Sequence, residues 1–236
     1  MDRVRHFLLY WAIPLLGIAM ARSAVASPFF VPTGSMVPTI AVGDRVLVQK
    51  YAYGLNIPWL QFQGTAGIGT LTTREVVRWA EPERGDVILF RTPEDVSIDY
   101  VKRVIGVPGD TVEVRDDRVI LNGEPVEKVY EGRDVFVDGS CREWPARRYQ
   151  SEIGGRNHQM FSGGLRMDHG PVTVPADALF VLGDNRGHSA DSRSWGFVPR
   201  ANVRGRAQGA FMGGNCKDQS WSGWHSFVGD SESDPN

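Results

Sequence analysis

The sequence predicts a mainly β protein that carries one N-terminal transmembrane helix. Between residues 29 and 212, short runs rich in β-branched residues alternate with glycine, proline and aspartate, which is typical of strands joined by turns. One long apolar run lies near the N-terminus, and no long amphipathic helix follows it. These observations favour a β-rich domain attached to a membrane segment.

The N-terminal element is an apolar segment behind a short basic tail. Residues 1–6 carry two arginines, and residues 7–20 carry no charge. Such a stretch of helix spans roughly 21 Å, which is short of a hydrocarbon core of about 30 Å, so we expect the anchor to cover residues 7–27. Arg22 would lie near its outer end, where a long side chain reaches the interface. The charge pattern predicts a cytoplasmic tail at 1–6 and an exported remainder.

A cleaved secretory signal is the alternative interpretation of this segment. Such a signal also has a basic start, an apolar middle and a small-x-small end, here Ala24-Val25-Ala26. The patterning alone does not separate the two, and the domain is exported in both.

The β-rich domain is expected over residues 28–212. Its strands are expected at 46–48, 87–90, 101–107, 112–114, 119–121, 179–182 and 207–211. Asn122-Gly123 is a hairpin signal, and Gly-Asp pairs such as 109–110 mark turns. Residues 54–80 and about 130–172 lack this periodicity, and we interpret them as loops or as a smaller inserted subdomain. The tail at 213–236 is rich in Gly, Ser and Asp, which predicts flexibility.

The composition fits a globular domain of ordinary charge. The 236 residues are 42% hydrophobic and 23% charged, and their net charge of −2 gives no reason to expect a nucleic-acid partner. The five histidines are scattered and no CxxC or HExxH occurs, so we expect no metal and no cofactor. In an exported domain Cys141 and Cys216 could form a disulfide or remain thiols, and the sequence leaves both open.

Ser35 and Lys102 are the first candidates for chemistry. A serine hydroxyl needs a base to remove its proton, and lysine serves only when burial lowers its pKa toward about 8. Strand alternation places Tyr100, Lys102 and Val104 on one face, whereas Arg103 points the other way and stays protonated. The alternatives are an exposed strand lysine and a plain surface turn at Ser35. The local pattern by itself favours these alternatives.

The loop around Ser35 could also stabilise a developing oxyanion. Gly34 lets the backbone approach a substrate carbonyl, and the Ser35 N–H and the Thr33 hydroxyl could donate to its oxygen.

A third polar segment covers residues 183–196. Asp191 and Arg193 could pair and hold it rigid, and Ser189 could then offer its hydroxyl to a buried lysine. A solvated loop closed by one ion pair fits the same residues. His188 lies here too, so counting alone does not exclude a Ser-His-Asp triad.

Together these segments resemble the type I signal peptidases of bacteria. The family's serine box SMxPT matches residues 35–39, its lysine box KRxxGxPGD matches residues 102–110, and its third box GDNRxxSxDSRxWG matches residues 183–196. The boxes occur in family order after one apolar segment. The resemblance covers about 29–51, 85–125 and 178–212.

The resemblance implies a membrane-anchored, β-rich catalytic domain built from antiparallel sheets, with a Ser–Lys dyad. Ser35 would be the nucleophile and Lys102 the general base. Thr33 and the Ser35 amide would form the oxyanion hole, although many members carry serine where this chain has Thr33. Ser189 would orient Lys102, and Asp191 with Arg193 would brace that loop. His188 falls at a position that the family leaves variable, which argues against a histidine triad.

The resemblance also implies a substrate. The family cuts exported preproteins after small residues at −1 and −3, because shallow apolar pockets leave no space for larger side chains. The matching substrate-binding positions are Phe29, Val31, Met36, Leu89, Asp99, Tyr100 and Val101. The substrate backbone would pair with a strand edge near residues 99–101.

The resemblance favours a retained anchor over a cleaved signal. The expected partners are then signal-peptide-bearing preproteins and membrane lipid. The expected location is the inner (plasma) membrane, crossed once, with the catalytic domain on the outer, periplasmic side. Because Ala24-Val25-Ala26 itself looks like a substrate, we also hypothesise self-processing between Ala26 and Ser27, in trans.

Other functions remain open at this stage. A specialised peptidase, such as one that matures pilin subunits, shares the serine and lysine but usually has a less complete third box. A membrane-tethered β domain that only binds partners would not need Ser35. Self-cleaving repressors also use a Ser–Lys dyad, but they carry a DNA-binding domain, which is not visible in this sequence.

Overall fold

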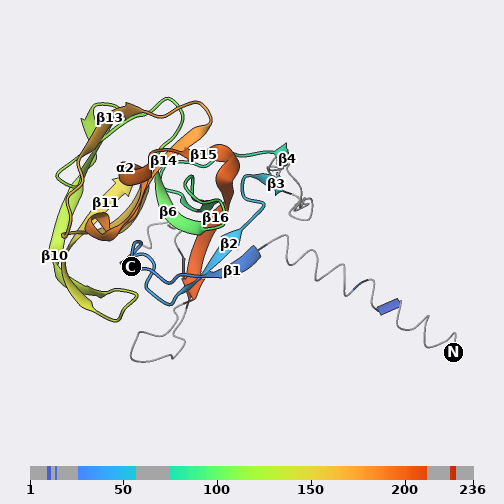
Figure 1. The fold of residues 1–236 in the computed structure, drawn as a ribbon, viewed down its shortest axis with the longest axis horizontal. Coiled ribbons are helices and arrows are strands. Elements are labelled where there is room, and N and C mark those ends of the chain that lie inside the picture. The colour runs from blue at the N-terminus through green and yellow to red at the C-terminus, as the bar shows by residue number, and fades with distance from the viewer. Residues whose placement is uncertain (1–9, 12–13, 15–25, 57–74, 212–223, 227–236) are drawn as a thin grey trace, which may run out of the picture.

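The computed structural model of the chain describes residues 10–11, 14, 26–56, 75–211 and 224–226 (Figure 1). Most of the predicted anchor at 7–27 and of the tail at 213–236 lies outside the described residues. Within the described part, no helix has the length and apolar character needed to cross a membrane. Ala26 and Ser27, which we expected at the end of the anchor, are extended and pair with Gln49 and Val48.

One antiparallel sheet carries the candidate site. Among the described residues its eight strands follow the order β1–β2–β16–β5–β6–β14–β15, with β17 beside β16. The bounds are β1 Ala26–Phe30, β2 Arg45–Gln49, β5 Val87–Arg91, β6 Asp99–Gly106, β14 Ala178–Leu182, β15 Val198–Pro199, β16 Val203–Phe211 and β17 Trp224–Ser226. The prediction of a mainly β protein with antiparallel sheets is therefore confirmed.

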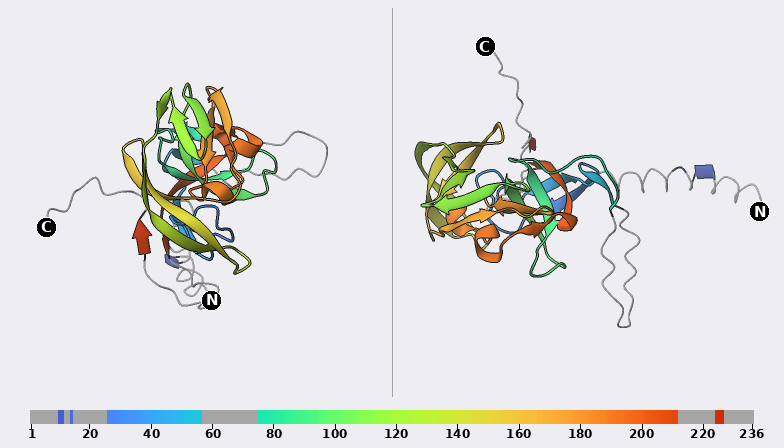
Figure 2. Two further views of the ribbon diagram at one scale, coloured as in Figure 1. Left: turned by 90° about the vertical axis from the view of Figure 1, so that its left-hand side faces the viewer. Right: turned by 90° about the horizontal axis from the view of Figure 1, so that it is seen from above.

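Three smaller antiparallel sheets complete the described part. The first contains β10 Lys128–Val137, β11 Glu143–Ile153 and β12 Arg156–Ser162. The second contains β13 His169–Thr173, β7 Thr111–Arg115, β8 Arg118–Leu121 and β9 Glu124–Pro125. The third pairs β3 Gly54–Asn56 with β4 Glu75–Arg78. The helical segments described beyond residue 26 are short: η2 Arg186–His188, α2 Ser192–Trp195 and η3 Arg200–Asn202. Most of the sheet β10–β12 lies away from β1, but the turn between β10 and β11 reaches back to the loop after β1, where a Cβ on Gly139 would lie 2.6 Å from Pro32 O (Figure 2).

Each of the seven strands expected from the sequence overlaps an observed one: β2, β5, β6, β7, β8, β14 and β16. The hairpin predicted at Asn122-Gly123 joins β8 to β9, and both residues have the positive φ that a tight hairpin turn requires, 54° and 87°. Residues 130–172, for which the sequence left loops or a smaller subdomain open, consist largely of strands β10 to β13. Most side chains of β10 are at least partly exposed, so these strands lack the apolar alternation that marks a half-buried strand.

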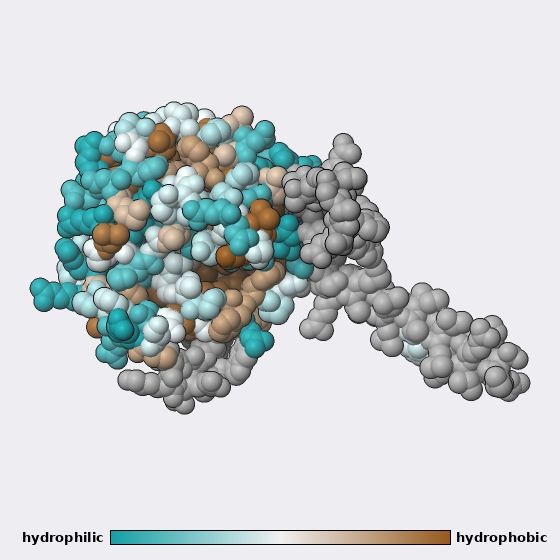
Figure 3. All heavy atoms as spheres, in the orientation of Figure 1, coloured by the Kyte–Doolittle hydropathy of each residue, from teal (hydrophilic) through white to brown (hydrophobic). Residues whose placement is uncertain are grey.

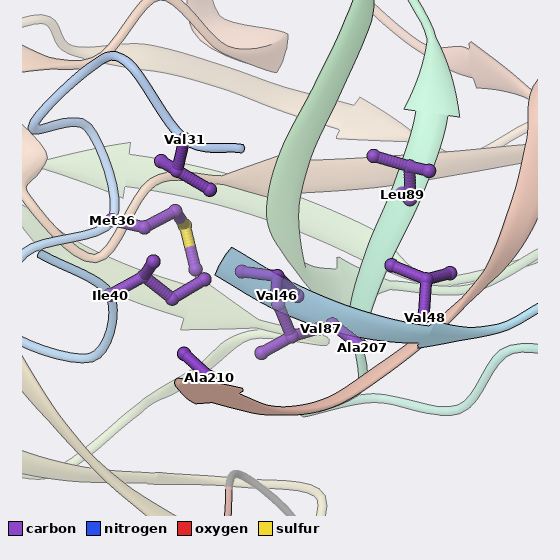
Figure 4. Close-up of a cluster of buried hydrophobic side chains, with 9 residues drawn as sticks. All are labelled: Val31, Met36, Ile40, Val46, Val48, Val87, Leu89, Ala207 and Ala210. Carbon is purple, nitrogen blue, oxygen red and sulfur yellow. The ribbon is translucent and has the colours of Figure 1, made fainter. Parts of the chain in front are cut away.

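A cluster of buried side chains fixes the loop between β1 and β2, which carries Ser35. The cluster comprises Val31, Met36, Ile40, Val46, Val48, Val87, Leu89, Ala207 and Ala210 (Figure 4). Met36 and Ile40 point from the loop toward Val46 of β2, and both are almost fully buried. Burying these two side chains stabilises the loop by roughly 1.5–3 kcal/mol each, so the position of Ser35 is set by the core.

Candidate active site

The loop that carries Ser35 is held from both ends. Within it, Ile40 N–H donates to Met36 O at 2.9 Å. From the third polar segment, Asn185 N–H donates to Ser35 O at 3.1 Å and Asn185 Nδ2 donates to Gly34 O at 3.0 Å. Thr39 Oγ1 donates to the carboxylate of Asp184. These bonds fix the Ser35 backbone against the strand that ends at Leu182.

Lys102 reaches Ser35 from the middle of β6. Its backbone is paired with Ile88 of β5. Its Nζ lies 2.7 Å from Ser35 Oγ and 3.1 Å from the Val101 carbonyl oxygen, with the Tyr100 ring centroid at 5.1 Å. Two residues that are 67 positions apart in the sequence thus meet at hydrogen-bond distance.

The amine of Lys102 is shielded from water. Only 3% of the residue is exposed, and this burial lowers its pKa from 10.5 to about 8, although the carboxylates of Asp191 and Asp184 act in the opposite direction. About one molecule in ten then carries a neutral amine at pH 7, compared with roughly one in a few thousand for a free lysine. The site therefore supplies an amine that can accept a proton.

Two buried ion pairs brace the third polar segment. Arg103 donates to both carboxylate oxygens of Asp184, at 2.9 and 2.7 Å. Arg193 donates to both oxygens of Asp191, each at 2.8 Å, and its Nη2 also donates to the Arg186 carbonyl oxygen at 2.7 Å. Burial by itself would raise the pKa of Asp184 and of Asp191, but the guanidinium groups outweigh it and both pKa values are lowered. Both carboxylates therefore stay charged.

Ser189, which the sequence predicts to orient Lys102, makes no hydrogen bond to it within the described part of the chain. The hydrogen bonds of Lys102 go to Ser35 and to the Val101 carbonyl. Ser189 Oγ is buried and lies near the Asp191 carboxylate, whose low pKa it helps to set. It packs directly against Gly183. The structure therefore brings this hydroxyl close to the site without joining it to the amine.

A pocket of about 300 Å³ opens beside Ser35 and Lys102. Its lining includes all seven predicted substrate-binding residues: Phe29, Val31, Met36, Leu89, Asp99, Tyr100 and Val101. Thr33, the candidate oxyanion donor, also lies in its wall and is exposed. Figure 3 shows apolar side chains gathered over β1 and β2, the strands that flank the Ser35 loop.

Five lining residues were missed by the sequence reasoning: Phe30, Pro32, Ile98, His188 and Ala190. Phe30, Pro32 and Ile98 are direct neighbours of predicted pocket residues, so their positions could have been inferred. His188 and Ala190 occupy variable positions of the third box, and no local pattern marks them.

The described residues contain no group of three or more His, Cys, Asp or Glu side chains arranged to hold a metal ion. Cys141 takes part in a disulfide. Cys216, which the sequence leaves as its possible partner, lies outside the described residues.

Comparisons with known proteins identify the family of this chain. A family model described as "Signal peptidase, peptidase S26" matches residues 4–212. A signal peptidase I of Pseudomonas fluorescens is 36% identical over 214 residues, which cover 84% of this chain and 69% of the relative. The signal peptidase I of Rickettsia typhi is 38% identical over 194 residues, covering 79% and 72%.

A crystal structure of a signal peptidase I from Enterococcus faecalis is also similar. It is 30% identical, with a TM-score of 0.33, over 53% of this chain and 96% of that chain. Because this TM-score is low, we assign the family from the sequence matches and not from this structure.

Proposed function

This chain belongs to the signal peptidase family S26, and on that premise we propose that it is a membrane-bound serine endopeptidase that removes signal peptides from exported preproteins. Ser35 is the nucleophile and Lys102 is the general base. The observation that carries the proposal is the distance of 2.7 Å between a buried Lys102 Nζ and Ser35 Oγ.

The reaction follows from this pair of groups. Neutral Nζ accepts the hydroxyl proton while Oγ of Ser35 bonds to the carbonyl carbon of the substrate. The ammonium group of Lys102 then returns this proton to the leaving nitrogen as the C–N bond breaks, which leaves an ester on Ser35. Water then gives a proton to the same amine as it attacks the ester carbon, and the C–Oγ bond breaks as the ammonium returns that proton to Ser35 Oγ. The Ser35 N–H and the Thr33 hydroxyl donate to the oxyanion.

The walls of the pocket explain why the substrate would carry small residues at positions −1 and −3 before the cleaved bond. Val31, Met36 and Leu89 line it, and the same three side chains belong to the buried core cluster. Because a close-packed core does not yield without loss of stability, these walls exclude large side chains instead of moving aside. The edge of β6 at residues 99–101 offers backbone groups to an extended substrate.

The test is cleavage of a preprotein with an Ala-x-Ala site by the full chain. Ser35→Ala, Lys102→Ala and Lys102→Arg should each abolish cleavage. The arginine variant is the sharpest, because it keeps a positive charge and removes the base. Lys128→Ala is a matched control, since Lys128 Nζ also lies 5.1 Å from a tyrosine ring, that of Tyr149, but outside the pocket. Cleavage by Lys102→Arg at the wild-type rate would refute the dyad.

The location belongs to the same proposal. The basic residues at 1–6, the apolar run at 7–27 and the family relationship support an anchor that crosses the inner membrane once, with the catalytic domain on the outer side. Protease added to intact spheroplasts should then digest the domain. Protection of the domain in that experiment would contradict this orientation.

A further inference from the structure

We infer that His188 forms the subsite for the first residue after the cleaved bond and that it favours a planar apolar side chain there over a lysine. This inference rests on the endopeptidase function proposed above. It concerns the part of the substrate that follows the cleaved bond, called here the departing side. The pocket residues implied by the family resemblance do not explain selectivity on that side.

His188 lines the pocket from a different segment than the residues assigned to the signal-peptide side. The walls formed by β1, β5 and β6 carry most of the residues assigned to the signal-peptide side, including Phe29, Leu89 and Tyr100. His188 and Ala190 come from the third polar segment instead. That segment also contributes Asn185, which bonds to Gly34 and Ser35.

The path of a substrate past Ser35 decides which wall meets its departing side. A chain that is cut in its middle must extend from the scissile bond in two directions. If its signal-peptide side runs along β1 and β6, the departing side leaves over the remaining wall, because both cannot occupy the same strand edges. Beyond the Ser35 loop and Ile98, which directly precedes β6, that wall is formed by His188 and Ala190, and of these two only His188 has a side chain large enough to select.

The imidazole ring of His188 is held in place by neighbouring rings. Its ring centroid lies 5.0 Å from that of Phe136 in β10 and 5.2 Å from that of Trp144 in β11. Trp144 is itself fixed, because its Nε1 donates to Asp138 at 2.7 Å. A Cβ on Gly164 would lie 2.6 Å from His188 Nε2, so the ring is enclosed on that side as well. A ring held in this way is a preorganised binding surface.

The surroundings of His188 also set the chemistry of the selected side chain. Its neighbours Phe136 and Trp144 are aromatic, and offset or edge contacts between rings are favourable. Arg142 and Asp138 flank the Trp144 ring with opposite charges, the guanidinium at 5.7 Å from the ring centroid and the carboxylate as the acceptor of Nε1. A lysine at the first position of the departing chain would lose part of its hydration against these rings.

The test compares two peptides that share an Ala-x-Ala site and differ only in the first residue after the cut, phenylalanine or lysine. The ratio of their kcat/KM values is measured by competition with the full chain in detergent micelles. His188→Ala and His188→Asn should lower the phenylalanine-to-lysine ratio by about threefold to tenfold, the value of one aromatic contact. His188→Phe keeps a ring and should preserve the ratio.

His169→Ala is the matched control, because His169 also packs on a phenylalanine, with its ring 5.6 Å from that of Phe180, but outside the pocket. It should leave the ratio unchanged. The ratio reports only on active molecules, so partial unfolding of a variant does not alter it. An unchanged ratio in His188→Ala and His188→Asn would overturn the inference. Failure of the wild type to cut either peptide would instead refute the proposed function.

Discussion

Arg103 and Asp184 form a bidentate ion pair that is almost completely shielded from water, with side-chain exposures of 3% and 0%. The pair joins β6, which carries Lys102, to the third polar segment. The Asp184 carboxylate also accepts from Thr39 Oγ1, so the loop that carries Ser35 is tied to the same pair. One ionic contact thus connects the three elements that build the candidate site.

We expect Arg103→Ala to destabilise the domain strongly. Removing one partner leaves an uncompensated buried carboxylate, which costs about 3–5 kcal/mol. Denaturant unfolding should show this loss. The matched control is Arg166→Ala, because the Arg166–Asp116 pair is 60% and 71% exposed and should contribute about 0–1 kcal/mol. Equal effects of the two substitutions would show that the buried pair does not stabilise the fold.

The pH dependence of cleavage should report the pKa of Lys102. Only the neutral amine accepts the proton of Ser35, so kcat/KM should rise with pH and level off above a midpoint near 8. Below the midpoint, kcat/KM should fall tenfold for each unit by which the pH is lowered. A midpoint near the value of 10.5 for an unperturbed lysine would mean that the amine is not desolvated.

Stability in acid should depend on His158. Burial, reinforced by the nearby Arg103, lowers the pKa of this histidine from 6.5 to about 3. Between these values the unfolded state binds a proton that the folded state does not, so stability is present above pH 6.5 and is lost as the pH falls toward 3, by at most about 1.4 kcal/mol per pH unit.

His158→Leu should reduce that loss, because the variant has no imidazole to protonate on unfolding. The free energy of unfolding would be measured by urea titration at pH 8 and at several values from 6.5 to 4. The informative quantity is the free energy of unfolding at pH 8 minus its value at each lower pH. This difference cancels the effect of the substitution on core packing, which is present at every pH. If wild type and variant lose stability in parallel, His158 is not the acid-sensitive group.

Gly183→Ala should reduce cleavage severely. A Cβ there would meet Ser189 Oγ and would lie 2.5 Å from the Ser35 carbonyl oxygen, so the Ser35 backbone would have to move. Displacement of about 1 Å at a catalytic group is enough for a loss of roughly 100-fold. Gly34→Ala is the steric comparison for stability, because the nearest atoms to its Cβ are 3.6 Å away. Circular dichroism melting should therefore show a larger decrease for Gly183→Ala than for Gly34→Ala.

Local patterning predicted the strands well because alternation and turn chemistry act over a few residues. Val112 and Val114 show the alternation, and Asn122-Gly123 gives the hairpin. The pattern failed for β10, whose alternating charges and exposed apolar residues resemble a loop. It also gave no means to predict that the Ser189 hydroxyl would pack beside Gly183 without a hydrogen bond to Lys102.

The sequence by itself determined the class of fold, the positions of most strands and the three segments that carry the candidate residues. Only the tertiary structure decided that Lys102 is buried, that its amine touches Ser35, and that His188 lies against rings from β10 and β11. The physical reason is the range of the interactions. Backbone preferences act between neighbours along the chain, whereas the pKa of a buried amine depends on water exclusion by strands that are distant in sequence.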